Sequence, residues 1–300
     1  MMMKNASESF HIETYFEAPI DKVWYSIATA EGMNTYLTYK AELRGKNEQP
    51  KPGDHFLLNY GDIENDQYIL QFDKNDTFRV KDTYESISPD GSVQTFQVQT
   101  STMLIKERDN LTKLTLMVEG FESDTYGQWF RECMRLGWTR SLLNLKSVLE
   151  LGMDLRTPLF SYPRLGVLNC TVNEEQKLEH NYADTGNYLL EVFPNSPASK
   201  AGLEKGDIII ALNNKETANY DEFVRVISSF NIEKDAINIK YLRNGSSHYT
   251  QAYLSLEGNF TGLVDTDEDT FDDIRQKREN LAKQRSSSGS LWKKDKGGKR

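Results

Sequence analysis

Alternating apolar and polar positions run through the first part of the chain, up to about residue 121, and they predict β-strands. Residues 11–18 alternate Ile, Tyr and Phe with polar side chains, a pattern typical of a half-buried strand. Between residues 54 and 121, further strand-like runs are separated by turn sequences such as DKND, SPDG and ERDN. We therefore expect a meander of antiparallel strands in this region.

Two segments of the same region follow a helical period instead. Pro19 opens a short helix with one apolar face, and we expect Gly32 to end or break that helix. Residues 126–151 place apolar side chains at helical intervals in a broad stripe, and Gly152 is a natural stop. A long striped helix after a meander is expected to pack across the concave face of the sheet, where such folds often leave a cavity.

The segments EAPIDKVWYSIATAEGMNTYL and GWTRSLLNLKSVLE resemble the SRPBCC (START-like) superfamily, in particular its activator-of-heat-shock-ATPase-like branch, over residues 9–152. The resemblance implies a helix-grip fold, a curved antiparallel sheet wrapped round a long C-terminal helix, which often holds a hydrophobic molecule. Tyr36 departs from the Trp that is common in the family. The candidate walls of such a ligand cavity are Tyr36, Phe72, Phe96 and Trp129. The alternative is that these aromatic residues, with Trp138, are plain core.

Residues able to carry chemistry are sparse in the first domain. His11 and His55 are its only histidines, and neither has a partner at metal-ligand spacing. Glu119 and Glu122 bracket a strand end, and they either face the cavity or lie in a solvated turn. We expect no catalytic residue, no metal site and no cofactor.

The stretch VFPNSPASKAGLEKGDIIIALNN, residues 192–214, is dense in turn and cap signals. Ser196 is a good N-cap before Pro197, and Gly202 is expected to end the short helix in the left-handed conformation. The isoleucine run that follows predicts a buried strand. Asn219 caps a second helix, and Asn244–Gly245 is a strong hairpin signal.

Together with the upstream RLGV, this stretch resembles a bacterial-type PDZ domain over residues 163–257. The resemblance implies that a peptide C-terminus adds as a strand between residues 167–172 and the Tyr220 helix. Its carboxylate would meet backbone N–H groups, and its last side chain would enter an apolar pocket. The implied peptide-binding residues are Leu165, Gly166, Val167, Tyr220, Val224 and Ile227. The alternative is a PDZ fold that binds an internal segment or its own chain.

Two residues depart from the common PDZ pattern. Asn169 stands where many peptide-binding members have an apolar groove residue, so a shallower or more polar pocket is expected. Arg164 replaces a glycine of the commonest carboxylate loop and would add positive charge there. The second half lacks the glycine-flanked serine elbow and the His/Asp/Ser set of a serine protease.

Charge and cysteine content limit the partners. The net charge is −9; residues 265–300 carry ten basic and eight acidic residues, a net +2, which leaves −11 on the rest. Such an acidic body is a poor candidate for nucleic-acid binding. The tail, residues 258–300, is interpreted as solubilising, disordered or partly helical; the less favoured alternative is a basic membrane-binding arm anchored by Trp292. Cys133 and Cys170 are interpreted as two buried thiols.

The sequence thus predicts an α+β protein: a helix-grip domain (9–152), a linker (153–162), a β-barrel-like PDZ domain with two helices (163–257) and the tail. No leader or membrane-spanning segment is visible, so we expect a cytoplasmic location. The predicted function is a non-enzymatic adaptor, whose PDZ domain binds a peptide and whose first domain binds a small hydrophobic ligand or a partner. One alternative is a chaperone cofactor or protease adaptor, in which the first domain binds a protein surface. The other is an enzyme acting on a hydrophobic substrate in the cavity.

Overall fold

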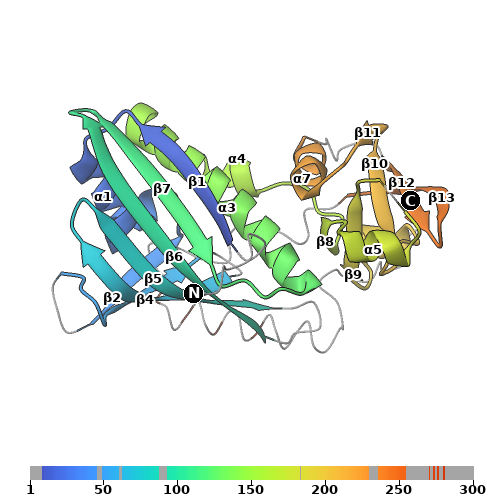
Figure 1. The fold of residues 1–300 in the computed structure, drawn as a ribbon, viewed down its shortest axis with the longest axis horizontal. Coiled ribbons are helices and arrows are strands. Elements are labelled where there is room, and N and C mark those ends of the chain that lie inside the picture. Colours follow the sequence, from blue (N-terminus) through green and yellow to red (C-terminus); the bar gives the residue numbers. More distant parts are fainter. Residues whose placement is uncertain are drawn as a thin grey trace.

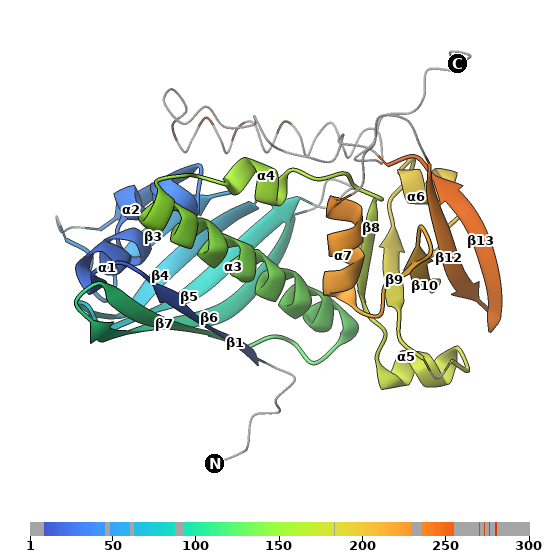
Figure 2. The same ribbon diagram turned by 90° about the horizontal axis from the view of Figure 1, so that it is seen from above.

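The computed structural model describes residues 9–45, 49–60, 63–87, 93–182, 184–229 and 236–254, with the single residues Thr270, Asp273, Gln276 and Asn280. The predictions for Trp292 and for nearly all of the tail therefore lie outside the described residues. The chain forms two α+β lobes side by side, joined through the long helix α3 and a short connection (Figures 1 and 2).

The first lobe is built on a curved, fully antiparallel sheet of seven strands in the order β1-β7-β6-β5-β4-β3-β2. Consecutive strands from β2 to β7 are neighbours, as the meander predicted, and β1 completes the sheet beside β7. The strand β2 was not predicted, although its five residues alternate between polar and apolar side chains. The strands are β1 (Ser9–Phe16), β2 (Lys40–Arg44), β3 (His55–Asn59), β4 (Ile63–Asp73), β5 (Thr77–Ile87), β6 (Val93–Arg108) and β7 (Leu111–Glu119).

Two short helices, α1 (Ile20–Ala28) and α2 (Ala30–Tyr36), follow β1, with Pro19 as the N-cap of α1. The prediction that Gly32 breaks this helical segment is wrong. The break lies at Thr29, whose backbone is extended and whose hydroxyl accepts the Gly32 N–H at 3.0 Å. Gly32 is instead a contact residue inside α2, since a Cβ there would lie 2.0 Å from the carbonyl oxygen of Tyr25.

Helix α3 (Thr125–Leu151) crosses the concave face of the sheet (Figure 2). It begins at Asp124, whose carboxylate accepts the Gly127 N–H at 2.7 Å, and it ends at Gly152, which has the left-handed φ of 69°. Phe130, Leu142 and Leu145 on one face of α3 are buried against the sheet. The predicted helix-grip architecture is confirmed.

One polar cluster interrupts the apolar interior between the sheet and α3. The Asp82 carboxylate is fully buried and accepts hydrogen bonds from Asn65 Nδ2 at 2.8 Å and from Thr100 Oγ1 at 2.5 Å. Burial raises the pKa of Asp82 to about 6, although hydrogen bonds from Thr100, Asn65 and Gln67 favour the ionised form. Asp82 therefore binds its proton more tightly than an ordinary aspartate does.

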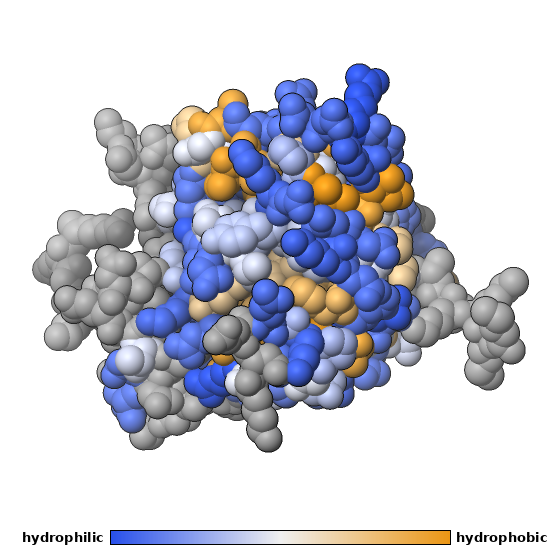
Figure 3. Space-filling view, turned by 90° about the vertical axis from the view of Figure 1, so that its left-hand side faces the viewer, coloured by the Kyte–Doolittle hydropathy of each residue, from blue (hydrophilic) through white to orange (hydrophobic). Residues whose placement is uncertain are grey.

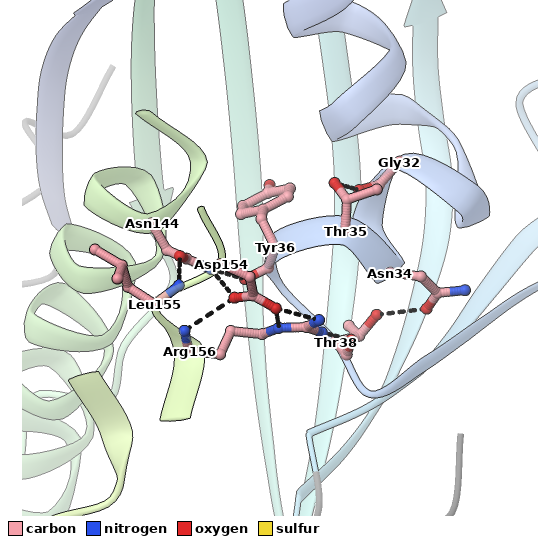
Figure 4. A network of polar contacts seen from close by, with 9 residues as sticks. All are labelled: Gly32, Asn34, Thr35, Tyr36, Thr38, Asn144, Asp154, Leu155 and Arg156. Carbon is pink, nitrogen blue, oxygen red and sulfur yellow. Dashed lines mark hydrogen bonds and ion pairs between the residues drawn. The ribbon is translucent and has the colours of Figure 1, made fainter. Parts of the chain in front are cut away.

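The connection between the lobes folds back along α3. The predicted linker contains a one-turn helix, α4 (Arg156–Phe160). Its start is fixed by the buried Asn144 of α3, which donates to Tyr36 O and Asp154 Oδ1 and accepts the Leu155 N–H (Figure 4). The Arg156 guanidinium joins this network through Asp154 and the carbonyl of Thr38. The connection is thus held against the first lobe.

The second lobe has a sheet in the order β13-β12-β10-β9-β8, with β11 paired to β10. The short helix is capped by Ser196 as predicted, and Gly202 has a φ of 76°. Asn213 and Asn214 both adopt positive φ in the predicted hairpin turn. The strands are β8 (Val167–Thr171), β9 (Asn187–Val192), β10 (Ile208–Leu212), β11 (Lys215–Glu216), β12 (Ile237–Arg243) and β13 (Ser246–Ala252), and the helices are α5 (Glu174–Glu179), α6 (Pro197–Lys200) and α7 (Tyr220–Ser228).

The expectation of two helices in this lobe is corrected by α5, a third one. Asn173 and Gln176 form a capping box, in which each side chain accepts the backbone N–H of the other residue at 3.0 Å. This signal was present in the sequence. Of the described helices in both lobes, none combines the length and apolar character that crossing a membrane requires.

Gly32→Ala is expected to destabilise the protein by about 2–3 kcal/mol, because its Cβ would meet backbone atoms that have no room to move. Gly137→Ala is the matched control: a Cβ at this α3 position meets nothing within 4 Å, so stability should rise by about 0.5–1 kcal/mol. Urea unfolding of the full chain measures both changes. Equal effects of the two substitutions would contradict the packing assigned to Gly32.

Asp82→Asn is expected to change how stability depends on pH. The folded pKa of about 6 lies above the ordinary aspartate value of 3.8, so the stabilisation from the bound proton is complete below pH 3.8 and is lost as pH rises through 6. Relative to the variant, the wild type should lose up to about 3 kcal/mol between pH 4 and pH 7. Urea unfolding at a series of pH values gives the difference, and a constant difference would refute the assignment.

Candidate functional site

The candidate peptide site lies at the edge strand of the second sheet, β8. Val172 N–H donates to Gly186 O at 2.9 Å, and Gly166 O accepts the Phe193 N–H at 3.0 Å, so even-numbered positions here pair inward with the β9 side. Because backbone direction alternates along an antiparallel strand, Val167, Asn169 and Thr171 direct their N–H and C=O groups outward. An outward-facing edge of this kind is what an added peptide strand pairs with.

The loop before β8, which is predicted to bind the peptide carboxylate, contains a glycine with positive φ. Gly166 is buried with a φ of 82°, a value that L-residues rarely adopt, and it separates Leu165 from Val167. The Arg164 guanidinium lies over the Tyr162 ring, with its carbon 4.4 Å from the ring centroid. The charge of Arg164 therefore lies against Tyr162, and Arg164 directly precedes the loop predicted to bind the carboxylate.

Helix α7 forms the opposite wall. Asn219 caps it by accepting the Glu222 N–H at 3.0 Å, and the Tyr220 N–H donates to the Thr171 hydroxyl at 3.0 Å, which ties the start of α7 to β8. Tyr220, Val224 and Ile227 share the face predicted to border the groove.

The α7 side chains predicted to border an open groove are in fact covered. The exposed fraction is 9% for Tyr220, 4% for Val224 and 3% for Ile227. Cys133 and Leu136 of α3, with Tyr162 of the connection, pack against the hydrophobic cluster that contains them. The groove between β8 and α7 is therefore closed in this structure by the chain's own α3, which lies beside both elements (Figure 2).

At one end of the groove, α3 side chains bond the outward edge of β8. Glu132 Oε2 accepts the Thr171 N–H at 2.8 Å, and Gln128 Nε2 donates to Thr171 O at 2.7 Å. Gln128 Oε1 also accepts from Asn173 Nδ2 at 3.0 Å. These two α3 side chains occupy both backbone groups with which Thr171 would pair with an added strand.

Further polar contacts follow α3 along the lobe. Arg135 forms an ion pair with Asp221 at the start of α7, and Arg140 donates to Ser228 Oγ at its end at 3.1 Å. Near the start of α3, Tyr126 Oη donates to Glu191 at 2.5 Å, which raises the pKa of Tyr126 to about 12. The contact therefore spans α7 from its first turn to its last.

Asn169 does not open a polar pocket in the groove. Its Nδ2 donates to Asn187 Oδ1 at 3.0 Å, and Asn187 Nδ2 donates in turn to the carbonyls of Thr217 and Asn219. All of these bonds lie beneath the groove, so Asn169 connects β8 to the start of α7.

The interpretation of both cysteines as buried is wrong for Cys133. Cys170 is fully buried, and burial raises the pKa of its thiol to about 12. Cys133 is half-buried because it lies at the contact between α3 and the second lobe, next to Tyr220. Burial raises the pKa of Tyr220 well above its usual value, so its hydroxyl remains protonated.

The contribution of α3 residues to this site was not predicted from the sequence. Gln128, Glu132, Cys133 and Leu136 were treated only as parts of a helix in the first domain. A signal was present: the apolar stripe of α3 is broader than one face requires, because Trp129, Met134 and Trp138 pack on the first core while Cys133 and Leu136 pack on the second. The sequence does not show which surface the additional apolar residues of α3 pack against.

The predicted ligand cavity of the first lobe is small. A cavity of about 20 Å³ under α3 has room for about one water molecule, and Tyr36 and Gln67 line it. Phe72 packs edge-on against Trp24, with ring centroids 5.1 Å apart, and Phe96 lies between Phe130 at 4.5 Å and Trp129 at 5.8 Å. Of the four predicted cavity residues, Tyr36 is the one that lines this cavity, and a ligand-binding role for all four stays a prediction.

The remaining polar candidates of the first lobe do not converge. His55 Nδ1, at the start of β3, lies 2.8 Å from Asp66 Oδ1 of β4. Glu119 accepts from Gln99 at 3.1 Å, and Glu122 is exposed. Within the described ranges, no group of three or more His, Cys, Asp or Glu residues is arranged to hold a metal ion.

Comparison with known sequences concerns the second lobe. The family model of the PDZ domain matches residues 163–252. A probable periplasmic serine protease do/HhoA-like of Haemophilus influenzae is 36% identical over 85 residues, which cover 28% of this chain and 18% of that protein. The serine endoprotease DegS of the same organism is 38% identical over 47 residues, 16% of this chain and 14% of its own length. The chain thus spans less than a fifth of each of these relatives.

Solved structures similar to this chain include the Aha1 dimer from Colwellia psychrerythraea, with 16% identity and a TM-score of 0.37, covering 49% of this chain and 98% of that one. An HSP90 activator from Plasmodium falciparum has 20% identity and a TM-score of 0.37, covering 47% and 96%. The sheet order and the crossing helix of the first lobe are themselves those of a helix grip. Residues 163–252 form a PDZ domain, and a helix-grip domain precedes it.

Proposed function

We propose that this protein is a non-enzymatic adaptor whose PDZ domain binds the C-terminal end of another protein. The bound peptide would extend the second sheet along β8, with its carboxylate at Leu165, Gly166 and Val167. Its last side chain would enter the pocket bordered by Val224 and Ile227. The observation that carries the proposal is the outward backbone edge of β8 beside a loop with a positive-φ glycine.

For the helix-grip domain, the small interior favours a protein partner over a hydrophobic ligand. A cavity of about 20 Å³ is far below the several hundred cubic ångströms of a typical small-molecule site, and stacked aromatic side chains fill much of the remaining space. The end of this lobe away from the PDZ domain shows apolar side chains in small patches among hydrophilic ones (Figure 3). A partner docking there would meet a mixed surface, as in many transient complexes.

The proposed compartment is the cytoplasm. Cys133 and Cys170 are not joined in a disulfide, which is consistent with a reducing environment. The serine protease relatives match this chain over parts that cover less than a fifth of their own length, and their catalytic activity is not carried over to this proposal.

The peptide proposal predicts dependence on a free carboxyl terminus. A pooled library of heptapeptides with free carboxyl ends should contain binders of about micromolar affinity, and amidation of these binders should weaken them at least tenfold. The reason is that amidation removes the charge that strengthens the hydrogen bonds from the loop N–H groups. Fluorescence polarisation with the full chain measures both affinities.

Arg164→Gln provides a protein-side control. It should lower the affinity ratio of free-acid to amidated peptide about threefold, because the neutral side chain no longer attracts the carboxylate. Any effect of the substitution on the α3 contact changes the affinities of the free-acid and amidated peptides by the same factor. The ratio of the two affinities is therefore independent of that contact. Equal binding of acids and amides by the wild type would rule out carboxylate recognition.

A further inference from the structure

We infer that α3 is the resident internal occupant of the PDZ groove, and that an external peptide binds only by displacing it. The inference rests on the proposed function, since it assigns a regulation to the same site. It makes the helix-grip domain the inhibitor of the PDZ domain in the same chain.

Side chains of α3 already pair with the backbone groups of β8 that a peptide strand would need. At Thr171, the carboxylate of Glu132 accepts the N–H and the amide of Gln128 donates to the C=O, at 2.8 and 2.7 Å. These bonds have the donor and acceptor pattern of an added strand, supplied by side chains of a helix. A peptide that pairs along the whole of β8 has to break both.

Helix α3 also packs on the hydrophobic cluster to which the apolar side chains of α7 belong. Leu136 and Cys133 pack on the hydrophobic cluster that contains Tyr220, Val224 and Ile227, and the exposed fractions of these three α7 side chains all lie below 10%. A peptide side chain needs the same contact surface, because apolar burial supplies most of the energy in such pockets. The helix and the peptide therefore compete for one surface.

The connection between the two lobes is anchored to α3 by hydrogen bonds. Asn144 fixes Asp154 and Leu155, and Arg140 donates to Leu159 O at 2.8 Å and lies over the Tyr162 ring at 4.8 Å. The chain thus returns along α3 and delivers β8 next to it. A tethered occupant has a high effective concentration, which lets a modest contact outcompete a free peptide.

The contact surface is nevertheless one that can open. Its ion pair between Arg135 and Asp221 is solvent-accessible, with side-chain exposures of 41% and 36%, and Glu132 and Gln128 are side chains that can rotate away. The apparent peptide affinity equals the intrinsic affinity multiplied by the fraction of open molecules. Weakening the α3 contact should therefore strengthen peptide binding.

The test is a charge-reversal cycle in the full chain. Arg135→Asp places like charges at the contact and should tighten binding of the heptapeptide pool about fivefold, the upper range for one exposed ion pair. Asp221→Arg should act in the same direction, and the double variant should return to within twofold of the wild type. Lys146→Asp is the matched control. It removes the α3 ion pair with Glu150, away from the second lobe, and the Lys146 side chain has a similar exposure of 39%. This variant should leave peptide affinity unchanged.

A second measurement reads the contact without any peptide. Cys133 lies half-buried against Tyr220, so its labelling by a maleimide, located by mass spectrometry, reports opening. Arg135→Asp and added peptide should each speed labelling of Cys133, while the buried Cys170 stays slow.

The outcomes separate the two proposals. If the wild type binds peptide as tightly as Arg135→Asp, and Cys133 stays protected in the complex, peptide binding stands and displacement is overturned. If Arg135→Asp exposes Cys133 but neither protein binds any peptide, the adaptor proposal fails and displacement falls with it. Tighter binding by both single variants, reversed in the double variant, supports displacement.

Discussion

The structure depends on one helix that serves two cores. Trp129, Met134 and Trp138 of α3 pack on the curved sheet of the helix-grip domain, while Cys133 and Leu136 pack on the hydrophobic cluster of the PDZ domain. A helix with two apolar faces must bury both, because an exposed second stripe would favour association with other molecules. This requirement fixes the PDZ domain against α3 and sets the state of its groove.

The backbone edge of β8 imposes the same arrangement from the other side. Buried N–H and C=O groups have to find partners, and an edge strand presents them in a row. Glu132 and Gln128 supply those partners at Thr171, so both backbone groups of this residue are paired in the closed groove. A groove covered only by an apolar surface would leave these two groups without partners.

Local signals in the sequence predicted most of the fold. Ser196, Gly202 and the pair Asn213–Asn214 act through caps and turns whose geometry depends only on neighbouring residues. The errors arose where packing between elements decides: Gly32 is packed against the carbonyl of Tyr25 in the preceding helix, and Val224, which was predicted to line an open groove, is buried. Composition and spacing contain no information about which surface an apolar stripe meets.

The two lobes also divide specificity and affinity in a physically reasonable way. The groove residues of β8 and α7 decide which peptide fits, whereas the α3 contact subtracts the same free energy from every peptide. A weak ligand would then fail to open the groove, and one that makes all its contacts would succeed. Because Asn144 and Arg140 anchor the connection, α3 remains close after it is displaced, so the groove would close again when the peptide leaves. The contact between α3 and the PDZ domain thus sets the minimum binding free energy that a peptide needs in order to occupy the groove.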